Sequence, residues 1–246
     1  MVKSRFSAAF LHLLMSGCVI AALLAVIFFI WYPAPYFQIS GALAPVLVLV
    51  SVDLVIGPLL TLVVYNTEKK SLKADLAVIV VLQLAAFLYG AHALASQRPV
   101  FVVLDGGVLE VVAWPDIQDA SEPPSELLDA LPIAGPMLVW ADSPDKSFYL
   151  DAVFSGDNAA LHPEFYHPIA DGVEVIQQSG VEITAQYLKE NKDVSAAIEG
   201  VGGVPAELLG KRIFPINARQ GDWSAVLDAE TGELLLEIPV GVEWIK

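Results

Sequence analysis

A carboxylate inside a long apolar run is the side chain in this sequence best placed to do chemistry. Asp53 lies within residues 46–65, a predominantly apolar stretch long enough to cross a bilayer, which takes roughly 20 residues. A charge at the centre of a bilayer costs about 3 kcal/mol or more, so it normally faces other helices or a water-filled cavity. Gly57 and Pro58 follow one turn later, and proline removes a backbone hydrogen bond from a helix. We therefore predict that Asp53 and a kink face the interior of a helix bundle.

Three roles are open for Asp53. A structural carboxylate would be hydrogen-bonded inside the bundle, with Gln83 or Tyr89 of a later apolar run as its partner. A docking carboxylate would meet a helix of another protein, and a proton-relay carboxylate would titrate. The chain has few apolar runs and few polar groups within them, whereas transporters generally use more of both. This favours the structural and docking roles.

Small residues recur four apart in two of the apolar runs. The first run holds Gly17, Ala21 and Ala25, and the third holds Ala86 and Gly90. This spacing lets helix backbones approach closely. It predicts helix–helix contacts, either within this chain or with a transmembrane helix of a partner.

The elements that must position these side chains are three apolar helices. We predict membrane spans over residues 8–32, 43–65 and 75–95. The first run is too long for a cleaved signal peptide, whose apolar core has about 7–15 residues. Basic residues concentrate on the cytoplasmic side of membranes, and here they cluster before the first span and between the second and third. The predicted topology has a cytoplasmic amino terminus and, in a bacterial inner membrane, a periplasmic domain after the third span.

Charge divides the chain at the same point. Residues 1–97 carry three acidic and five basic residues, and residues 98–246 carry 25 acidic and eight basic ones, in a chain of net charge −15. We predict a three-helix transmembrane domain over residues 1–97 and an acidic, mixed α+β periplasmic domain over residues 98–246. An acidic domain argues against nucleic-acid binding, which needs a basic surface. Cys18 is the only cysteine, so no intramolecular disulfide is possible.

Local patterns indicate the elements of the acidic domain. Strands are expected over residues 100–104, 108–114, 137–141, 148–154, 212–216, 223–228 and 233–238. Helices are expected over residues 123–131, 184–191 and 194–199. Asp105-Gly106-Gly107 predicts a hairpin between the first two strands, and Ala229-Glu230-Thr231-Gly232 a turn between the last two. The pattern of residues 155–180 assigns no element.

No motif predicts an enzyme. His162, Glu164 and His167 come nearest to a metal site, but two prolines break regular spacing and no cysteine supports them. The glycines at positions 200–203 are not followed by the Lys-Ser/Thr of a phosphate loop, and no nucleophile motif occurs. We expect no catalytic residue, no metal and no cofactor.

Four segments form a set with a known counterpart. They are Asp53–Thr61, Lys69–Ala77, Gln83–Gly90 and Arg98–Val100. As a set they resemble the type IV pilin accessory proteins of the TfpX/TfpZ type, and the resemblance covers about residues 45–105. It implies a non-enzymatic, chaperone-like inner-membrane protein of type IV pilus biogenesis. Its implied partners are the major type IV pilin and other pilus assembly components, and its implied task is to stabilise that pilin and promote its assembly or surface display.

Two other functions stay open from the residues alone. A membrane sensor, or an accessory for proton or solute transport, would use Asp53 and Gln83. A cell-envelope enzyme would have its site within residues 155–180. If the chain binds a pilin, the candidate packing or client-contact residues are Gly17, Ala21, Ala25, Asp53, Gly57, Pro58, Gln83, Ala86 and Gly90.

Overall fold

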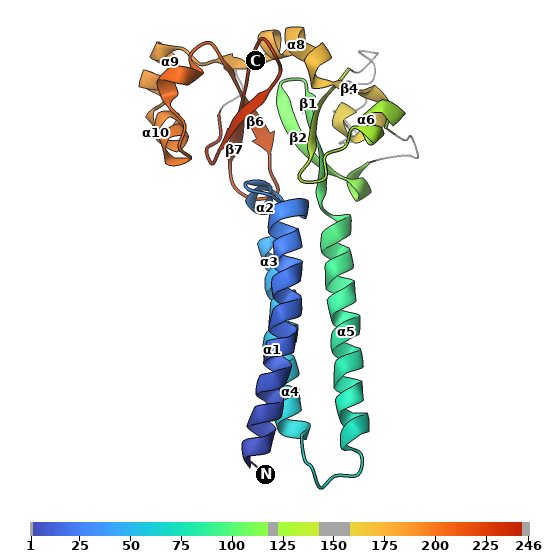
Figure 1. Cartoon of the computed structure of the whole chain (residues 1–246). Helices are drawn as coiled ribbons and strands as arrows, with labels where there is room; N and C mark the ends of the chain where they lie inside the picture. Colours follow the sequence, from blue (N-terminus) through green and yellow to red (C-terminus); the bar gives the residue numbers. More distant parts are fainter. Residues whose placement is uncertain (1, 118–122, 143–157, 243–246) are drawn as a thin grey trace. The chain divides into compact units, whose positions relative to one another are not determined.

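The computed structural model describes residues 2–117, 123–142 and 158–242. The chain divides into two compact units, which we describe separately (Figure 1). The membrane unit comprises residues 1–37 and 41–98, and the sheet unit comprises residues 38–40 and 99–246. The membrane unit contains three helices long and apolar enough to cross a bilayer, and the sheet unit contains a mixed sheet with helices. The predicted fold class is confirmed.

Helices account for most of the membrane unit. In chain order the helices of residues 2–98 are α1 (Val2–Val26), η1 (Ile27–Trp31), α2 (Tyr36–Ile39), α3 (Leu43–Ser51), η2 (Val52–Ile56), α4 (Gly57–Val64) and α5 (Leu72–Ser96), of which α2 crosses the boundary between the two units. The segments able to cross a membrane are Ser4–Trp31, Leu43–Val64 and Leu72–Ser96. These three spans lie where the apolar runs predict them. We call them the first, second and third span.

The second span contains a π-helical turn where the sequence predicts a kink. The turn η2 joins α3 to α4 directly before Gly57 and Pro58. Pro58 has no N–H for the carbonyl four residues earlier, and its ring crowds that carbonyl. A π-helical turn accommodates this, and such single turns are frequent at functional sites. Asp53 is one of the five residues of the turn.

The apolar core of the membrane unit occupies one half of its length. The first and third spans both pack on the second. The buried residues of the core are Ile20, Ile27, Tyr32, Ala42, Val46, Leu49 and Leu94. The hydroxyl of Tyr32 donates a 2.8 Å hydrogen bond to the carbonyl of Leu94, which ties the end of the first span to the end of the third. At the other end, Lys69 forms an ion pair with Asp75 at the start of α5. The half of the bundle between this ion pair and the core is less tightly filled.

The sheet unit holds eight strands among its described residues. They are β1 (Pro99–Asp105), β2 (Val108–Ala113), β3 (Met137–Ala141), β4 (Tyr166–Pro168), β5 (Val181–Glu182), β6 (Arg212–Asn217), β7 (Trp223–Leu227) and β8 (Leu234–Ile238). The α-helices among its described residues are α6 (Ser125–Asp129), α8 (Val173–Ser179), α9 (Ala185–Glu190) and α10 (Lys192–Gly200). The strand predicted over residues 148–154 lies outside the described residues.

The strands form one mixed sheet in the order β4-β3-β1-β2-β6-β7-β8, with β5 paired to β6. The predicted β1–β2 hairpin is present, and β6, β7 and β8 form an antiparallel meander. β3 pairs with β1, and β6 with β2, in parallel. These two parallel pairs join the hairpin to segments far along the chain. β1 therefore lies between two neighbours and is buried through Leu104.

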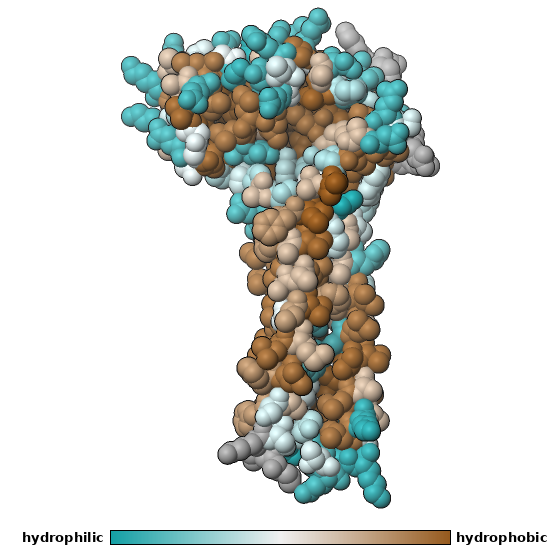
Figure 2. All heavy atoms as spheres, in the orientation of Figure 1, coloured by the Kyte–Doolittle hydropathy of each residue, from teal (hydrophilic) through white to brown (hydrophobic). Residues whose placement is uncertain are grey.

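Two apolar clusters stabilise the sheet unit. One surrounds Phe101 and combines β1, β2 and β3 with Leu127 of α6, Ala160 and Tyr166. The other packs α10 against β6, β7 and β8 through Ile183, Val194, Ile198, Leu208, Ile213, Val226 and Ile238. In Figure 2 polar residues lie around the margins of this unit, and hydrophobic residues occupy the middle of the visible face.

Candidate functional site

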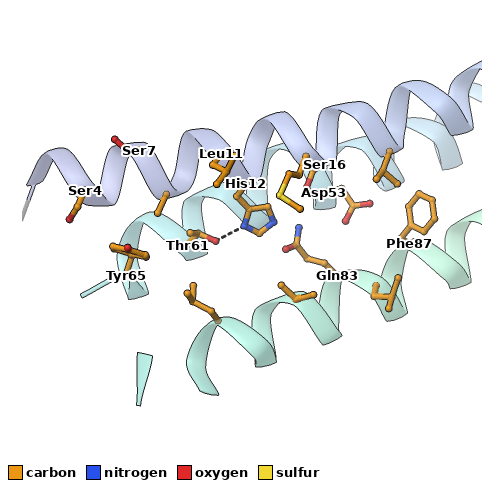
Figure 3. Close-up of a pocket in the computed structure, with 16 residues that line it drawn as sticks. Ser4, Ser7, Leu11, His12, Ser16, Asp53, Thr61, Tyr65, Gln83 and Phe87 are labelled. Atoms are coloured by element: carbon orange, nitrogen blue, oxygen red, sulfur yellow. Dashed lines mark hydrogen bonds between the residues drawn. The ribbon is translucent and has the colours of Figure 1, made fainter. Parts of the chain in front are cut away.

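A cavity of about 830 Å³ opens between the three spans of the membrane unit (Figure 3). α1 supplies one wall, η2 and α4 supply the second, and α5 supplies the third. Most of the lining is apolar. The polar side chains that line it include His12, Ser16, Asp53, Thr61, Tyr65 and Gln83. Polar groups from three separate helices therefore converge on one space inside the bundle.

Asp53 and Gln83 are brought together in this cavity. Asp53 is only 6% exposed. Figure 3 shows the amide of Gln83 between His12 and Asp53. Both polar atoms of that amide are buried and have no close hydrogen-bond partner among the described residues, and the side chain with which the amide interacts is Asp53. Tyr89, the other predicted partner, is 78% exposed and does not line the cavity, and that interpretation is wrong.

Gly57 provides the space that the side chain of Gln83 occupies. A Cβ atom at Gly57 would overlap the Gln83 amide. Gly57 lies four residues after Asp53, and residues four apart lie near each other on one face of a helix. A larger residue at position 57 would push the amide aside. Gly57 therefore positions Gln83 next to Asp53.

His12 is a cavity residue that the sequence analysis missed. Its Nδ1 atom shares a 2.6 Å hydrogen bond with the hydroxyl of Thr61, which links the first span to the second (Figure 3). His12 is the only histidine of the first span. A titratable side chain inside an apolar run was the signal that could have identified it. With His12, all three spans contribute a polar side chain to the cavity.

The other candidate residues of the second and third spans lie outside the cavity. A Cβ atom at Gly90 would come within 2.7 Å of Leu49 in the core, so α5 approaches the second span closely there. Pro58 lines a separate apolar groove, together with Phe10. Ala86 is exposed on the surface of α5. These three residues belong to the packing or the surface of the bundle and not to its polar cluster.

The small-residue stripe of the first span makes no tight contact within the chain. Ala21 and Ala25 are exposed, and a Cβ atom at Gly17 would meet no atom within 4 Å. None of the three lines the cavity. The interpretation of the stripe as an internal packing face is therefore wrong, because the first span packs through another face. A contact between the stripe and a partner stays a prediction.

Ala21→Leu is expected to leave the amount of protein in the membrane unchanged. Surface substitutions usually change stability by less than about 0.5 kcal/mol, and an added apolar side chain on this face meets lipid. Gly90→Leu is the matched contrast, since its side chain would enter the space of Leu49. Quantitative immunoblots of membranes should show normal Ala21→Leu protein and reduced Gly90→Leu protein. Strong depletion of Ala21→Leu would mean that the stripe does lie at a contact.

Two partly buried carboxylates of the sheet unit join distant segments. Asp105 accepts a 3.1 Å hydrogen bond from the backbone N–H of Ala159, and burial raises the pKa of Asp105. Glu110 accepts a 2.8 Å hydrogen bond from the amide of Asn217, its neighbour in the parallel β2–β6 pair. Burial raises the pKa of Glu110 as well. Raised pKa values mean that both groups stabilise the fold most at acidic pH, and that this contribution is lost as the pH rises through those values.

The described residues of the whole chain include no group of three His, Cys, Asp or Glu side chains close enough to hold a metal ion. His162 instead lies beside Glu164, with 3.4 Å between Nδ1 and a carboxylate oxygen, and its ring packs near that of Phe165. Among the described residues, the polar side chains that line the membrane cavity are therefore the best candidates for binding a partner through hydrogen bonds. They offer hydrogen-bond acceptors and donors inside the bilayer.

This combination defines a membrane protein in which a three-helix bundle with an internal polar cavity is followed by a mixed-sheet domain. Residues 1–41 match the family described as fimbrial assembly protein FimB. The fimbrial assembly protein of serogroups C1 and C2 from Dichelobacter nodosus is 36% identical over 126 residues, which cover 50% of this chain and 89% of that relative. The chain belongs to the fimbrial assembly protein family.

Two longer relatives extend the similarity along most of the chain. The Dichelobacter nodosus fimbrial assembly proteins of serogroups I and E1 are 29% and 28% identical over 241 residues. In each case the match covers 89% of this chain and 88% of the relative. No solved structure matches the chain significantly. The resemblance to type IV pilus accessory proteins is confirmed at the level of the family.

Proposed function

We propose that this protein is a chaperone-like accessory of type IV fimbria assembly that binds the major fimbrial subunit while the subunit is still in the membrane. Membership of the fimbrial assembly protein family supports a role in fimbrial assembly. The relatives from Dichelobacter nodosus are named for that role. The proposed task of this chain is to stabilise the subunit and to promote its assembly or its display on the surface.

The membrane cavity is the observation that supports binding of a client. Asp53 is buried among apolar helices, and the amide of Gln83 has no close hydrogen-bond partner among the described residues. Unpaired polar groups inside a bilayer are costly, so a protein that keeps them gains from a partner that pairs with them. A recognition site of this kind needs no chemical step. We therefore propose a binding protein without catalytic residues, metal or cofactor.

The proposed location is the inner membrane of a bacterium, with the amino terminus in the cytoplasm and the sheet unit in the periplasm. The basis is the placement of Lys and Arg residues, which concentrate before the first span and between the second and third spans. A fimbrial subunit that awaits assembly in the same membrane would then be accessible to both units of this chain.

A reporter enzyme that is active only in the periplasm tests this topology. Fused after Lys246, the reporter is expected to be active, since an odd number of spans separates that end from the cytoplasmic amino terminus. Fused after Lys70, between the second and third spans, it should be silent. Cell fractionation and immunoblots should show equal amounts of both fusions. The reverse pattern of activity would place the sheet unit in the cytoplasm and exclude the proposed topology.

Deletion of the gene tests the proposed role in assembly. We expect surface fimbriae to be lost and to return when the full chain is supplied from a plasmid. The quantities to measure are fimbriae sheared from the cell surface and subunit retained in the membrane. Normal surface fimbriae in the deletion strain would overturn the proposal.

One observation favours a second candidate function. Asp53, Gln83 and His12 line the same cavity, as a sensor or an accessory of proton or solute transport would require. Such a mechanism depends on a carboxylate that titrates, whereas client binding depends on a group that forms hydrogen bonds. Substitutions of Asp53 distinguish the two.

A further inference from the structure

We propose that the cavity between the three spans is the binding site for one transmembrane helix of the fimbrial subunit, and that this helix carries a side-chain hydrogen-bond donor at the depth of Asp53. The inference rests on the proposed function and adds the place and the chemistry of recognition. It concerns the membrane unit alone. The groups that carry it are Asp53, Gln83 and Gly57.

The cavity has the length of a helix segment. Its lining extends along α1 from Ser4 to Val19 and along α5 from Leu76 to Phe87. At a rise of 1.5 Å per residue, these stretches correspond to about 22 Å and about 17 Å along the helices. Because the first and third spans both pack on the second, the groove has three helical walls and one open side. A fourth helix that enters from the bilayer would complete a four-helix arrangement.

Lipid chains fill such a groove poorly. An acyl chain has no donor or acceptor, so it would leave both polar atoms of the Gln83 amide without a close hydrogen-bond partner in hydrocarbon, beside the Asp53 carboxylate. Unpaired buried groups of this kind cost free energy that a polar partner recovers. A helix supplies apolar side chains for most of the lining and a polar side chain at a single level. That composition matches the groove.

The hydrogen-bonding character of Asp53 and Gln83 determines which group the client helix must supply. An ionised carboxylate only accepts hydrogen bonds, whereas an amide both donates and accepts. The described residues that line the cavity include no Lys or Arg that could neutralise Asp53. The complementary client group is therefore a donor, namely a hydroxyl, an amide or an ammonium. Gly57 contributes by leaving space for Gln83, so that the amide stands beside the carboxylate when the client enters.

Site-specific photo-crosslinking in living cells tests whether the client helix binds in the cavity. Val80 and Val81 are neighbours on α5, are 55% and 64% exposed, and differ in that only Val80 lines the cavity. Met15 and Leu14 form the same kind of pair on α1. A benzophenone amino acid is introduced at each position of the full chain, and products are detected with antibody against the major fimbrial subunit. We expect at least a fivefold stronger subunit adduct from positions 80 and 15 than from positions 81 and 14.

The donor is tested in the same experiment. Mass spectrometry should place the adduct on the client within one helical turn of a side chain with an O–H or N–H group. In a chain that also carries Asp53→Leu, adducts from position 80 should fall about tenfold, the effect of losing one strong buried hydrogen bond. In a chain that carries Asp53→Asn, which keeps an acceptor of the same shape, the adducts should largely persist. An adduct on a purely apolar stretch, or one indifferent to Asp53→Leu, would overturn the assignment of a donor.

Other outcomes separate this inference from the proposed function. Equal adducts from positions 80 and 81 would show that the subunit meets the bundle outside the cavity. A further benzophenone position is Ile133, which is 88% exposed in the sheet unit. Subunit adducts from position 133 alone would overturn binding in the cavity but leave client binding intact. Adducts between two copies of this chain from position 80 would identify a second copy as the occupant and overturn the inference. Absence of subunit adducts from every position would count against the proposed function as well.

Discussion

Asp53→Leu is expected to abolish surface fimbriae, whereas Asp53→Asn should retain most of them. Asparagine has nearly the shape of aspartate and keeps an acceptor, so it can pair with a client donor in place of the carboxylate. Leucine removes the acceptor and leaves the client donor unpaired in hydrocarbon. Asp53 faces a cavity and not a filled core, so an apolar side chain at this position is compatible with the bundle. Both variants should therefore accumulate normally.

The two substitutions also distinguish binding from proton transfer. Surface fimbriae and chain abundance are measured for the wild-type chain and both variants in a deletion strain. If Asp53 carries protons, asparagine and leucine should fail alike because neither side chain titrates. Equal and complete loss of fimbriae at normal chain abundance would contradict the binding mechanism and favour the transport alternative.

Phe101→Ala is expected to lower the free energy of unfolding of the sheet unit by about 3–5 kcal/mol, as for other fully buried phenylalanines. Phe101 is 0% exposed and lies in β1, between β2 and β3. Its ring packs edge-on to Tyr166, with centroids 5.1 Å apart, and to Trp114 at 6.1 Å. Removal of the ring leaves a hole where three strands meet.

Urea unfolding of the full chain in detergent, followed by tryptophan fluorescence, measures this loss. With a slope of about 2 kcal/mol per molar urea, the midpoint should fall by about 2 M. Ile133→Ala is the control, since Ile133 is 88% exposed and its truncation should not move the midpoint. An unchanged midpoint for Phe101→Ala would mean that the Phe101 cluster does not stabilise the unit.

Much of the architecture is predictable because its signals are local. Apolar runs of about 20 residues identify the three spans without knowledge of how they pack. The Asp105-Gly106-Gly107 turn and its flanking β-branched runs identify the first hairpin, and Gly232 with φ 75° provides the left-handed residue of the last turn. These features depend on neighbours in the sequence. The parallel pairing of β1 with β3 and of β2 with β6 depends on distant segments, and no local sequence pattern predicts it.

The candidate site is predictable only in part for the same reason. The cost of a charge in a bilayer identifies Asp53 from the sequence, and the Gly-Pro pair indicates an irregular helix. The close approach of Gln83 to Gly57 depends on how α5 packs on the second span. Residue spacing within one span does not specify that packing. His12 lies inside an apolar run, which is a signal in itself, but its partner Thr61 lies on another span, and sequence spacing does not reveal that contact. The small-residue stripe that begins at Gly17 led to a wrong prediction of internal packing, since small residues permit close packing but do not require it.

Co-purification of the major fimbrial subunit with this chain tests the central claim most directly. Membranes that contain the tagged full chain and the subunit are solubilised in mild detergent, and the chain is captured by its tag. We predict that the subunit elutes with the wild-type chain and the Asp53→Asn chain in similar amounts, and that about tenfold less elutes with the Asp53→Leu chain. Immunoblots of the starting membranes establish that all proteins are present equally. Absence of the subunit from the wild-type eluate, with both proteins abundant in the solubilised membranes, would contradict the proposal that this chain binds the fimbrial subunit.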